Sequence, residues 1–269
     1  MCNECGCAVG TGKVEVRDGQ GIGTSSQPDA GSVEVLTGIL HQNDHQAAHN
    51  RAHFDGHEVL AINLMSSPGS GKTRLLEATI DAIGDRVRIA VIEGDLETET
   101  DALRIRAKGV PAVQITTGQT CHLDAHMVHD ALHLLDLAQV DLLFIENVGN
   151  LVCPAGFDLG QHANVTLLSA AEGDDKPAKY PVMFRAADLV LLSKADLFPV
   201  FDDFLPARAT GHVRALANDA EVFSVSARQA DLLAPWLDWL DGRLSSLHSG
   251  AVLRPRLVQG RTNHGHVAP

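Results

Sequence analysis

Aromatic residues, long apolar runs and positive charge are all scarce in this sequence. Aromatic residues make up only 4% of the 269 positions, so we expect a core built mainly from Leu, Val, Ile and Ala. No apolar run approaches the roughly 20 residues that a membrane-spanning helix requires. The amino terminus also lacks the basic and apolar segments of a secretion signal. These absences predict a cytoplasmic protein with no membrane partner.

The charge balance excludes one large class of function. The chain carries 21 Lys and Arg residues against 34 Asp and Glu residues, a formal net charge of −13. A nucleic-acid binder needs clustered cations to contact phosphates, so we expect no nucleic-acid partner. A single nucleotide is not excluded, because backbone N–H groups and one lysine can hold its phosphates.

Cysteine and histidine are unevenly distributed along the chain. Three of the five Cys residues fall within the first seven positions, and nine of the 14 His residues fall in two short windows. In a reducing compartment such clusters indicate metal binding more than disulfides.

The composition divides the chain into four parts. Residues 1–35 are expected to form a flexible tail, because the stretch after the first Cys residues is rich in Gly, Ser, Thr and Gln. Residues 36–57 are predicted to be helical and carry a histidine series. A compact domain is expected over about 58–250, followed by a loose carboxyl-terminal tail at 251–269.

Short apolar runs alternate with amphipathic segments in the compact part. The runs are apolar throughout rather than alternating, which is typical of parallel strands buried on both faces. This pattern predicts an α/β fold with a doubly wound, mostly parallel sheet flanked by helices, whose ligand lies at the carboxyl ends of the strands. Strands are expected at 59–65, 87–92, 112–115, 142–145, 165–168, 189–192 and 222–225, and helices at 72–83, 122–137 and 206–216.

A phosphate-binding loop follows the first of these strands. The segment 66–73 reads SSPGSGKT, which matches G-x-x-x-x-G-K-[ST] apart from Ser66 at the first glycine. Gly69, Ser70 and Gly71 would let the backbone N–H groups face phosphate, and the helix that begins here adds its positive dipole end. Lys72 would reach the β- and γ-phosphates, and the Thr73 hydroxyl would bind Mg²⁺. A chance glycine-rich turn is the alternative.

Two acidic residues at strand ends can complete the Mg²⁺ site. Asp95 follows the second strand, and Glu146 ends the strand at 142–145. In a P-loop hydrolase such a carboxylate holds Mg²⁺ or its water, and a following glycine, here Gly149, contacts the γ-phosphate. We therefore assign Lys72, Asp95 and Glu146 to catalysis, with a solvated acidic loop as the alternative for Asp95.

The residues after two later strands indicate guanine as the base. Ser193, Lys194 and Asp196 resemble the N-K-x-D motif, in which the Asp accepts hydrogen bonds from two guanine N–H groups that adenine lacks. Ser226 and Ala227 resemble the S-A-[KR] loop, whose backbone N–H reaches guanine O6. Ser193 replaces the usual Asn, so we expect one tethering contact to be weakened or lost. A surface turn, or adenine as the base, is the alternative.

Two sets of residues could bind a transition metal. Cys121, His122 and Cys153 would suit Zn²⁺ or Ni²⁺ if the fold brings them together, although buried cysteines acting as small apolar residues are an equal alternative. Cys2, Cys5 and Cys7 are close enough to wrap one soft ion such as Ni²⁺ or Zn²⁺. For this triad the alternatives are half of an iron–sulfur site or an incidental tail.

The two histidine windows have different helical geometry. In the first, spaced by four residues, each step drifts by about 40°, so only neighbouring pairs share a face. In the second, the imidazoles share one face opposite the apolar residues, which predicts a solvent-facing stripe, and His126 could supply a ligand beside His122. The windows contain His41, His45, His49, His53 and His57, and His122, His126, His129 and His133.

Taken together, these motifs resemble the HypB family, the GTPases that insert nickel during [NiFe]-hydrogenase maturation. The resemblance covers nearly the whole chain and is most specific in the cysteine and histidine motifs. It is carried by Cys2, Cys5 and Cys7, the Asn50-Arg51 pair, the loop 66–73, the segments 95–98, 121–124 and 146–153, and Lys194 with Asp196.

The resemblance implies a P-loop GTPase of the class related to signal-recognition GTPases and MinD, which forms a homodimer when GTP binds. It implies a Zn²⁺/Ni²⁺ site of Cys121, His122 and Cys153 near the dimer interface, and a tighter nickel site of Cys2, Cys5 and Cys7. GTP hydrolysis would drive nickel toward the hydrogenase large-subunit precursor, together with a small nickel/zinc chaperone.

The residues also suggest how the two sites communicate. Gly149 and Cys153 share one loop, so a γ-phosphate that pulls Gly149 would move Cys153 relative to Cys121 and His122. Nickel would then alter nucleotide affinity by the same factor. No obvious base for the attacking water is visible, so we expect slow intrinsic turnover. The rival interpretations are an ATP-dependent P-loop kinase and a nickel or zinc store with a structural nucleotide site.

Overall fold

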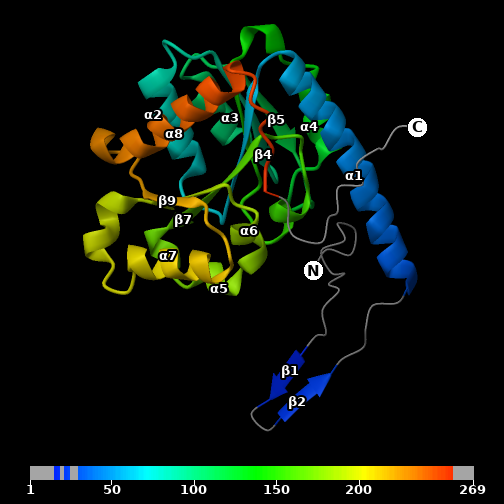
Figure 1. Cartoon of the computed structure of the whole chain (residues 1–269), viewed down its shortest axis with the longest axis vertical. Helices are drawn as coiled ribbons and strands as arrows, with labels where there is room; N and C mark the ends of the chain where they lie inside the picture. Colours follow the sequence, from blue (N-terminus) through cyan, green and yellow to red (C-terminus); the bar gives the residue numbers. More distant parts are fainter. Residues whose placement is uncertain (1–14, 19–20, 25–29, 257–269) are drawn as a thin grey trace.

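The computed structural model describes residues 15–18, 21–24 and 30–256 (Figure 1). Cys2, Cys5 and Cys7 lie outside these residues, so the thiolate site expected there stays a prediction. A short antiparallel hairpin of β1 (Glu15–Asp18) and β2 (Gly21–Thr24) lies within the segment whose composition predicts a linker.

Seven parallel strands form the central sheet, in the order β5-β4-β6-β3-β7-β8-β9. This arrangement confirms the predicted doubly wound α/β fold. The chain moves outward from β3 first to one side and later to the other, as a doubly wound sheet requires. The strands are β3 (Leu60–Ser66), β4 (Ile89–Asp95), β5 (Ala112–Thr116), β6 (Leu142–Glu146), β7 (Ala163–Ser169), β8 (Leu189–Ser193) and β9 (Glu221–Ser224).

Helices cover both faces of this sheet (Figure 1). Within the described residues, none of them is both long and apolar enough to cross a membrane. The α-helices are α1 (Ala30–Gly56), α2 (Lys72–Ile83), α3 (Thr100–Arg106), α4 (Ala125–Leu132), α5 (Lys176–Lys179), α6 (Pro181–Arg185), α7 (Pro206–Ala215) and α8 (Ala230–His248), and short 3₁₀ turns occupy Leu137–Gln139, Cys153–Gly156, Ala170–Glu172 and Ala195–Val200.

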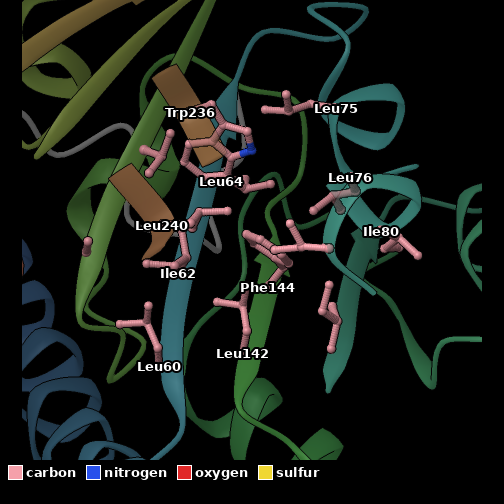
Figure 2. Close-up of a cluster of buried hydrophobic side chains, with 14 of the residues drawn as sticks. Leu60, Ile62, Leu64, Leu75, Leu76, Ile80, Leu142, Phe144, Trp236 and Leu240 are labelled. Atoms are coloured by element: carbon pink, nitrogen blue, oxygen red, sulfur yellow. The ribbon is translucent and has the colours of Figure 1, made fainter. Parts of the chain in front are cut away.

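The core on one face of the sheet lies between β3, β6, α2 and α8 (Figure 2). Ile62 and Leu64 point to this face because side chains two residues apart on a strand share a side. Leu76 of α2 and Trp236 of α8 pack against them, and the Trp236 indole N–H donates to Thr79 Oγ1 at 2.9 Å. This packing fixes α2, and therefore the loop before it, against the sheet.

The opposite face is covered by α1 and α4 over β3, β4 and β6, and by α6 and α7 over β7 and β8. Ala61 of β3 and Leu143 of β6 point to this side and meet Phe54 of α1 and Val128 of α4. The strands are thus buried on both faces, which explains why their sequences show no polar alternation.

Helix α4 is shorter than the sequence predicts. The expected helix at 122–137 begins instead at Ala125, because the Asp124 side chain accepts a hydrogen bond from Met127 N at 2.8 Å and caps the helix there. Cys121 and His122 consequently precede the helix and lie in the turn that leads into it.

The segment 251–256 contacts the domain, although the sequence predicts a loose tail from 251 onward. The backbone N–H of Arg256 donates to the Asp188 carboxylate, and its carbonyl accepts from Asn164 Nδ2 at 3.3 Å. Leu253 is buried at the edge of the core. These contacts hold the first part of the expected tail in place.

Candidate functional site

The carboxyl ends of four strands bring the predicted nucleotide residues to one edge of the sheet. β3 ends at Ser66, β4 at Asp95, β6 at Glu146 and β8 at Ser193. Because all four strands run in the same direction, the loops that follow them lie together, where open α/β sheets bind ligands.

The loop after β3 has the backbone of a phosphate cradle. Gly71 has φ +97°, in the left-handed region that favours glycine, and α2 begins at the next residue. Lys72 is 8% exposed, and its Nζ donates to Ser66 Oγ at 3.1 Å. Ser66, which stands where the motif has its first glycine, therefore holds the lysine amine over the loop.

Glu172 fastens this loop from outside and is absent from the sequence-based predictions. Its carboxylate accepts hydrogen bonds from the Ser67 hydroxyl and, at 2.7 Å, from the Ser70 hydroxyl. Glu172 itself is fixed by a capping box with Ser169. The S-x-x-E spacing of that box was the signal in the sequence that could have indicated an ordered glutamate here.

Ser193 also holds the phosphate loop in place. We expected that replacing the usual Asn by Ser193 would weaken or remove one such contact, and this contact is present. The Ser193 hydroxyl donates to the Ser70 carbonyl at 2.7 Å. Beside it, Lys194 has φ +58°, and its amine donates to the Gly69 carbonyl at 2.8 Å. The shorter serine side chain can make the contact because β8 brings its end next to the loop.

A pocket of about 320 Å³ lies between the phosphate loop and the ends of β8 and β9. Asp196, Ser226, Ala227 and Lys194 are among the residues that line it. The Asp196 carboxylate accepts a hydrogen bond from Ser226 Oγ at 2.7 Å, and Ala195 N donates to the Val225 carbonyl. The two predicted base motifs are therefore brought to one pocket.

A buried group of carboxylates lies beside Thr73. The Thr73 hydroxyl donates to Glu146 Oε1 at 2.9 Å, and oxygens of Glu93, Asp101 and Glu146 lie within 4.8 Å of one another. Burial and the Glu146 carboxylate raise the pKa of Glu93 to about 11, and burial also raises the pKa of Glu146. Together the two groups hold a proton at neutral pH, because two adjacent buried negative charges are unfavourable.

The same group fits a divalent cation. One carboxylate oxygen on Glu93 and one on Glu146 are buried without a hydrogen-bond partner among the described residues. Oxygen-rich ligand sets of this kind suit Mg²⁺, whose charge would replace the shared proton. The sequence analysis missed Glu93 and Asp101, although an acidic residue within the apolar run of β4 was a usable signal.

Asp95 lies at the mouth of the site but is engaged elsewhere. Its carboxylate accepts hydrogen bonds from Leu96 N at 2.7 Å and from the Thr98 hydroxyl at 2.6 Å, which lower its pKa although burial opposes them. It is not a member of the carboxylate group described above. Its assignment to Mg²⁺ remains a prediction.

The fold brings Cys121, His122 and Cys153 together. The two Sγ atoms lie 3.0 Å apart, and ligand atoms of all three residues lie within 4.8 Å of one another. His122 is 3% exposed and stacks on Phe157, with ring centroids 3.9 Å apart. Burial lowers the pKa of His122, and its buried Nδ1 has no hydrogen-bond partner among the described residues. Two thiols and a neutral imidazole are a suitable set for Ni²⁺ or Zn²⁺.

Gly149 lies between the phosphate loop and the loop of Cys153. A Cβ atom at Gly149 would lie 2.9 Å from the backbone of Pro68, so only glycine permits this close approach. The next residue, Asn150, donates its backbone N–H to the Ser66 carbonyl at 2.8 Å, and its side chain accepts from Val152 N at 2.7 Å.

Asn147 connects the two sites at a second point. Its Oδ1 accepts a hydrogen bond at 3.1 Å from the backbone N–H of Leu123, the residue that follows His122. Its Nδ2 donates to Asn63 Oδ1 at 3.2 Å. The Leu123 side chain also packs on Gly94, where a Cβ atom would lie only 2.8 Å away. Each segment of the thiol site therefore contacts a strand end of the nucleotide site.

The histidine windows lie only partly as the sequence predicts, since His126 and His133 are exposed but His122 is buried. His126 is exposed and lies outside the thiol and imidazole group of Cys121, His122 and Cys153. His129 meets the rings of α1, with its centroid 5.1 Å from that of His49. Burial, followed by neighbouring imidazoles, lowers the pKa values of His53 and His129. Part of the expected solvent stripe is thus a helix-to-helix contact.

Comparison with known proteins agrees with these motifs. A sequence model of the family described as "CobW/HypB/UreG, nucleotide-binding domain" matches residues 60–224. The hydrogenase maturation factor HypB of Azotobacter vinelandii is 46% identical over 90% of this chain and 92% of its own length. The chain belongs to the HypB family. This membership confirms the resemblance inferred from the motifs.

Other HypB proteins show the same relationship. HypB of Escherichia coli K12 is 49% identical over 78% of this chain and 72% of its own length. The crystal structure of Helicobacter pylori HypB in complex with nickel superposes with a TM-score of 0.73 at 43% identity, covering 78% of this chain and 96% of that one. HypB proteins are hydrogenase maturation factors of a nickel-binding P-loop GTPase family, and the present chain shares that fold and those motifs.

Proposed function

We propose that this HypB protein hydrolyses GTP to GDP and phosphate, and uses the nucleotide state to control a nickel ion held by Cys121, His122 and Cys153. Nickel is the cargo in this scheme, and its destination is the [NiFe]-hydrogenase large-subunit precursor. The observation that carries the proposal is the pair of consecutive residues at the end of β6. Glu146 contacts Thr73 in the nucleotide site, and Asn147 contacts Leu123 beside the metal site.

At the nucleotide site, each residue has a role that its position supports. Backbone N–H groups from Gly69 to Thr73 face the phosphates, and Lys72 exchanges its bond to Ser66 for phosphate oxygens. Asp196 accepts hydrogen bonds from the guanine N–H groups in the pocket that Ser226 and Ala227 also line.

The carboxylate group supports Mg²⁺ binding by the Thr73 hydroxyl and Glu146, with Glu93 and Asp101 near them. Bound there, Mg²⁺ would neutralise charge on the phosphates. Asp95 stands at the mouth of this site, where a movement of its loop would bring its carboxylate toward the phosphates.

At the metal site, motion of the Gly149 loop would alter the position of Cys153. Gly149 packs against Pro68 of the phosphate loop, so a γ-phosphate that draws the Gly149 N–H inward moves the loop that carries Cys153. Cys121 and His122 lie on a different segment. Their geometry relative to Cys153, and therefore the nickel affinity, would then depend on the nucleotide.

The remaining parts of the proposal rest on family membership. We place the protein in the cytoplasm and expect it to form a homodimer when GTP binds. A small nickel/zinc chaperone would supply or receive the metal. Zn²⁺ would compete for the same thiolates, and Cys2, Cys5 and Cys7 would form a second, tighter nickel site.

The decisive experiment uses the full chain with Cys2, Cys5 and Cys7 replaced by Ser, so that only the domain site retains thiolates. Ni²⁺ affinity is measured in GDP and in a non-hydrolysable GTP analogue. We expect a several-fold difference that disappears in the further variant Cys153→Ala. Equal affinities in the two nucleotides would contradict the coupling and leave dimerisation or partner docking as the effect of GTP.

A second variant separates the proposal from a metal store with a structural nucleotide site. Lys72→Ala should abolish phosphate release, since it removes the amine that contacts the β- and γ-phosphates, and should leave Ni²⁺ binding in GDP unchanged. Unimpaired nickel delivery to the hydrogenase precursor by this variant would favour the store. Faster turnover of ATP than of GTP by the unaltered chain would favour the kinase interpretation.

A further inference from the structure

Four imidazoles from two helices form one cluster away from the thiol site. His49 and His53 come from α1, His129 comes from α4, and His133 is the residue that caps the carboxyl end of α4. The ring centroids of His49 and His53 lie 4.6 Å apart, those of His49 and His129 5.1 Å, and those of His129 and His133 4.8 Å. The ring centroids of His53 and His129 lie 6.0 Å apart. Neither sequence window alone predicts this group, because it joins one pair from each.

The two helices that carry the cluster are fixed against each other by buried amides. Helix α1 lies beside α4 (Figure 1). Asn43 Oδ1 accepts from Ala125 N at 2.9 Å, and Asn50 Nδ2 donates to the Ala125 carbonyl at 2.8 Å, so α1 holds both backbone groups of the first residue of α4. Each helix therefore presents its histidines in a defined position.

Asn50 also sets the tautomer of one ring. Its Nδ2 donates to two carbonyls, those of Ala125 and Leu159, which fixes the orientation of the amide. Its Oδ1 must then be the acceptor for His129 Nδ1 at 3.1 Å, so His129 carries its proton on Nδ1. The other nitrogen, Nε2, is left with a lone pair. A hydrogen bond to the remote ring nitrogen is the arrangement that orients metal-ligating histidines.

We propose that His49, His53, His129 and His133 form a binding site for a divalent transition-metal ion that joins α1 to α4. Residues four apart on a helix lie on one face, so each helix offers a two-imidazole clamp, and the two clamps face each other. Imidazole ligands suit Ni²⁺, Cu²⁺ and Zn²⁺. The four histidines are not among the groups of described residues whose ligand atoms already lie within 4.8 Å of one another. The rings of His49, His53 and His133 are exposed, and binding would require rotations about their side-chain torsions that bring the nitrogens onto a common ion.

This site is independent of the GTP-dependent scheme proposed above. Its ligands are nitrogens only, whereas the domain site contains two thiols, Cys121 and Cys153. Ni²⁺ bound by thiolates gives a thiolate-to-metal charge-transfer absorption in the near ultraviolet, and Ni²⁺ bound by imidazoles alone does not. The two kinds of site can therefore be followed separately in the same protein.

The test counts Ni²⁺ ions bound per full-length chain by equilibrium dialysis at pH 7.5, with the charge-transfer absorption recorded in parallel. The double variant His49→Gln with His133→Gln removes one imidazole from each helix. We expect it to bind about one ion fewer per chain than the unaltered protein, with the same charge-transfer intensity. Both replaced side chains are exposed, and unchanged GDP affinity would show that the fold is intact.

The matched control is the double variant His41→Gln with His126→Gln, which also removes one exposed imidazole from each of α1 and α4. It should bind as many Ni²⁺ ions as the unaltered protein. Equal uptake by the His49/His133 variant and the unaltered chain would overturn the proposal. The same loss in both double variants would also overturn it, since it would show diffuse binding by surface histidines.

Discussion

The side-chain oxygen of Asn147 accepts a hydrogen bond from the backbone N–H of Leu123 at 3.1 Å. Asn147 directly follows Glu146, which accepts from the Thr73 hydroxyl, and Leu123 directly follows His122. A displacement of the β6 end by the nucleotide would thus be passed to the segment that carries Cys121 and His122, the metal ligands of our proposal. The contact is buried, so it is not exchanged for one with water.

Replacing Asn147 with Ala should uncouple the two sites. The variant leaves Leu123 N without its acceptor, so the free energy of unfolding should fall by about 1–3 kcal/mol. Nickel affinity should become less dependent on whether GDP or a GTP analogue is bound, as measured by Ni²⁺ titration in each nucleotide. Asn164→Ala is the matched control, because it breaks the same chain of buried amides and does not touch Leu123. A full nucleotide dependence in Asn147→Ala would show that the coupling runs elsewhere.

His122 and His126 give a direct test of which imidazole binds metal. His122→Ala removes a buried ligand candidate. We measure it in a chain whose Cys2, Cys5 and Cys7 are replaced by Ser, and expect at least a tenfold loss of Ni²⁺ affinity. Even the loss of a residue that only hydrogen-bonds a metal ligand typically lowers metal affinity by this much. His126→Ala should leave the affinity unchanged, because this side chain is exposed and outside the group. Competition with a metal-binding dye measures both. Equal losses would mean that the turn before α4 rearranges to use either ring.

Asp196→Asn should weaken guanine nucleotides specifically. In our proposal the carboxylate accepts hydrogen bonds from two guanine N–H groups, whereas the amide would turn a donor toward one of them. We therefore expect a loss of about 1.5–3 kcal/mol, or about tenfold to 150-fold in GDP affinity. Calorimetric titration with GDP and ADP measures the change. Asp202→Asn carries the same charge change at an exposed position and should bind GDP normally. Unchanged GDP affinity in Asp196→Asn would remove the guanine assignment.

The buried imidazole of His162 should make the free energy of unfolding depend on pH. Its buried ring accepts from Ala61 N at 2.9 Å and lies 2.9 Å from Asp55 Oδ1, and burial lowers its pKa below 6.5 although Asp55 opposes the shift. The unfolded chain therefore binds a proton at higher pH than the folded chain does. Stability from this group is complete above pH 6.5 and declines as the pH falls below that value, by at most about 1.4 kcal/mol per pH unit.

Urea unfolding of the protein between pH 5 and pH 8 measures this effect. The His162→Gln variant, which cannot take up the proton, should show a flatter dependence below pH 6.5 and a lower stability at pH 8. His248→Gln, at the exposed end of α8, is the control and should keep the slope of the unaltered chain. Identical slopes in all three proteins would show that His162 does not titrate in this range.

Local sequence patterns were sufficient for the sheet and for each nucleotide motif. The uniformly apolar runs predicted seven strands, and all seven are present within a few residues of the expected bounds. The loop from Ser66 to Thr73 could be read directly because a phosphate cradle is built from consecutive residues. The start of α4 could not be predicted in this way, because the Asp124 cap sets it at Ala125, whereas the apolar periodicity extends over 122–137.

The sequence by itself determined the strand and helix order, the phosphate loop and the base motifs, because each depends on neighbours along the chain. Only the tertiary structure decided that Cys121 and Cys153 meet, that Glu93 and Asp101 join Glu146, and that the histidines of α1 and α4 form one cluster. These groups unite residues far apart in the chain. Their proximity depends on strand order and helix packing, which the periodicity of a single segment does not encode.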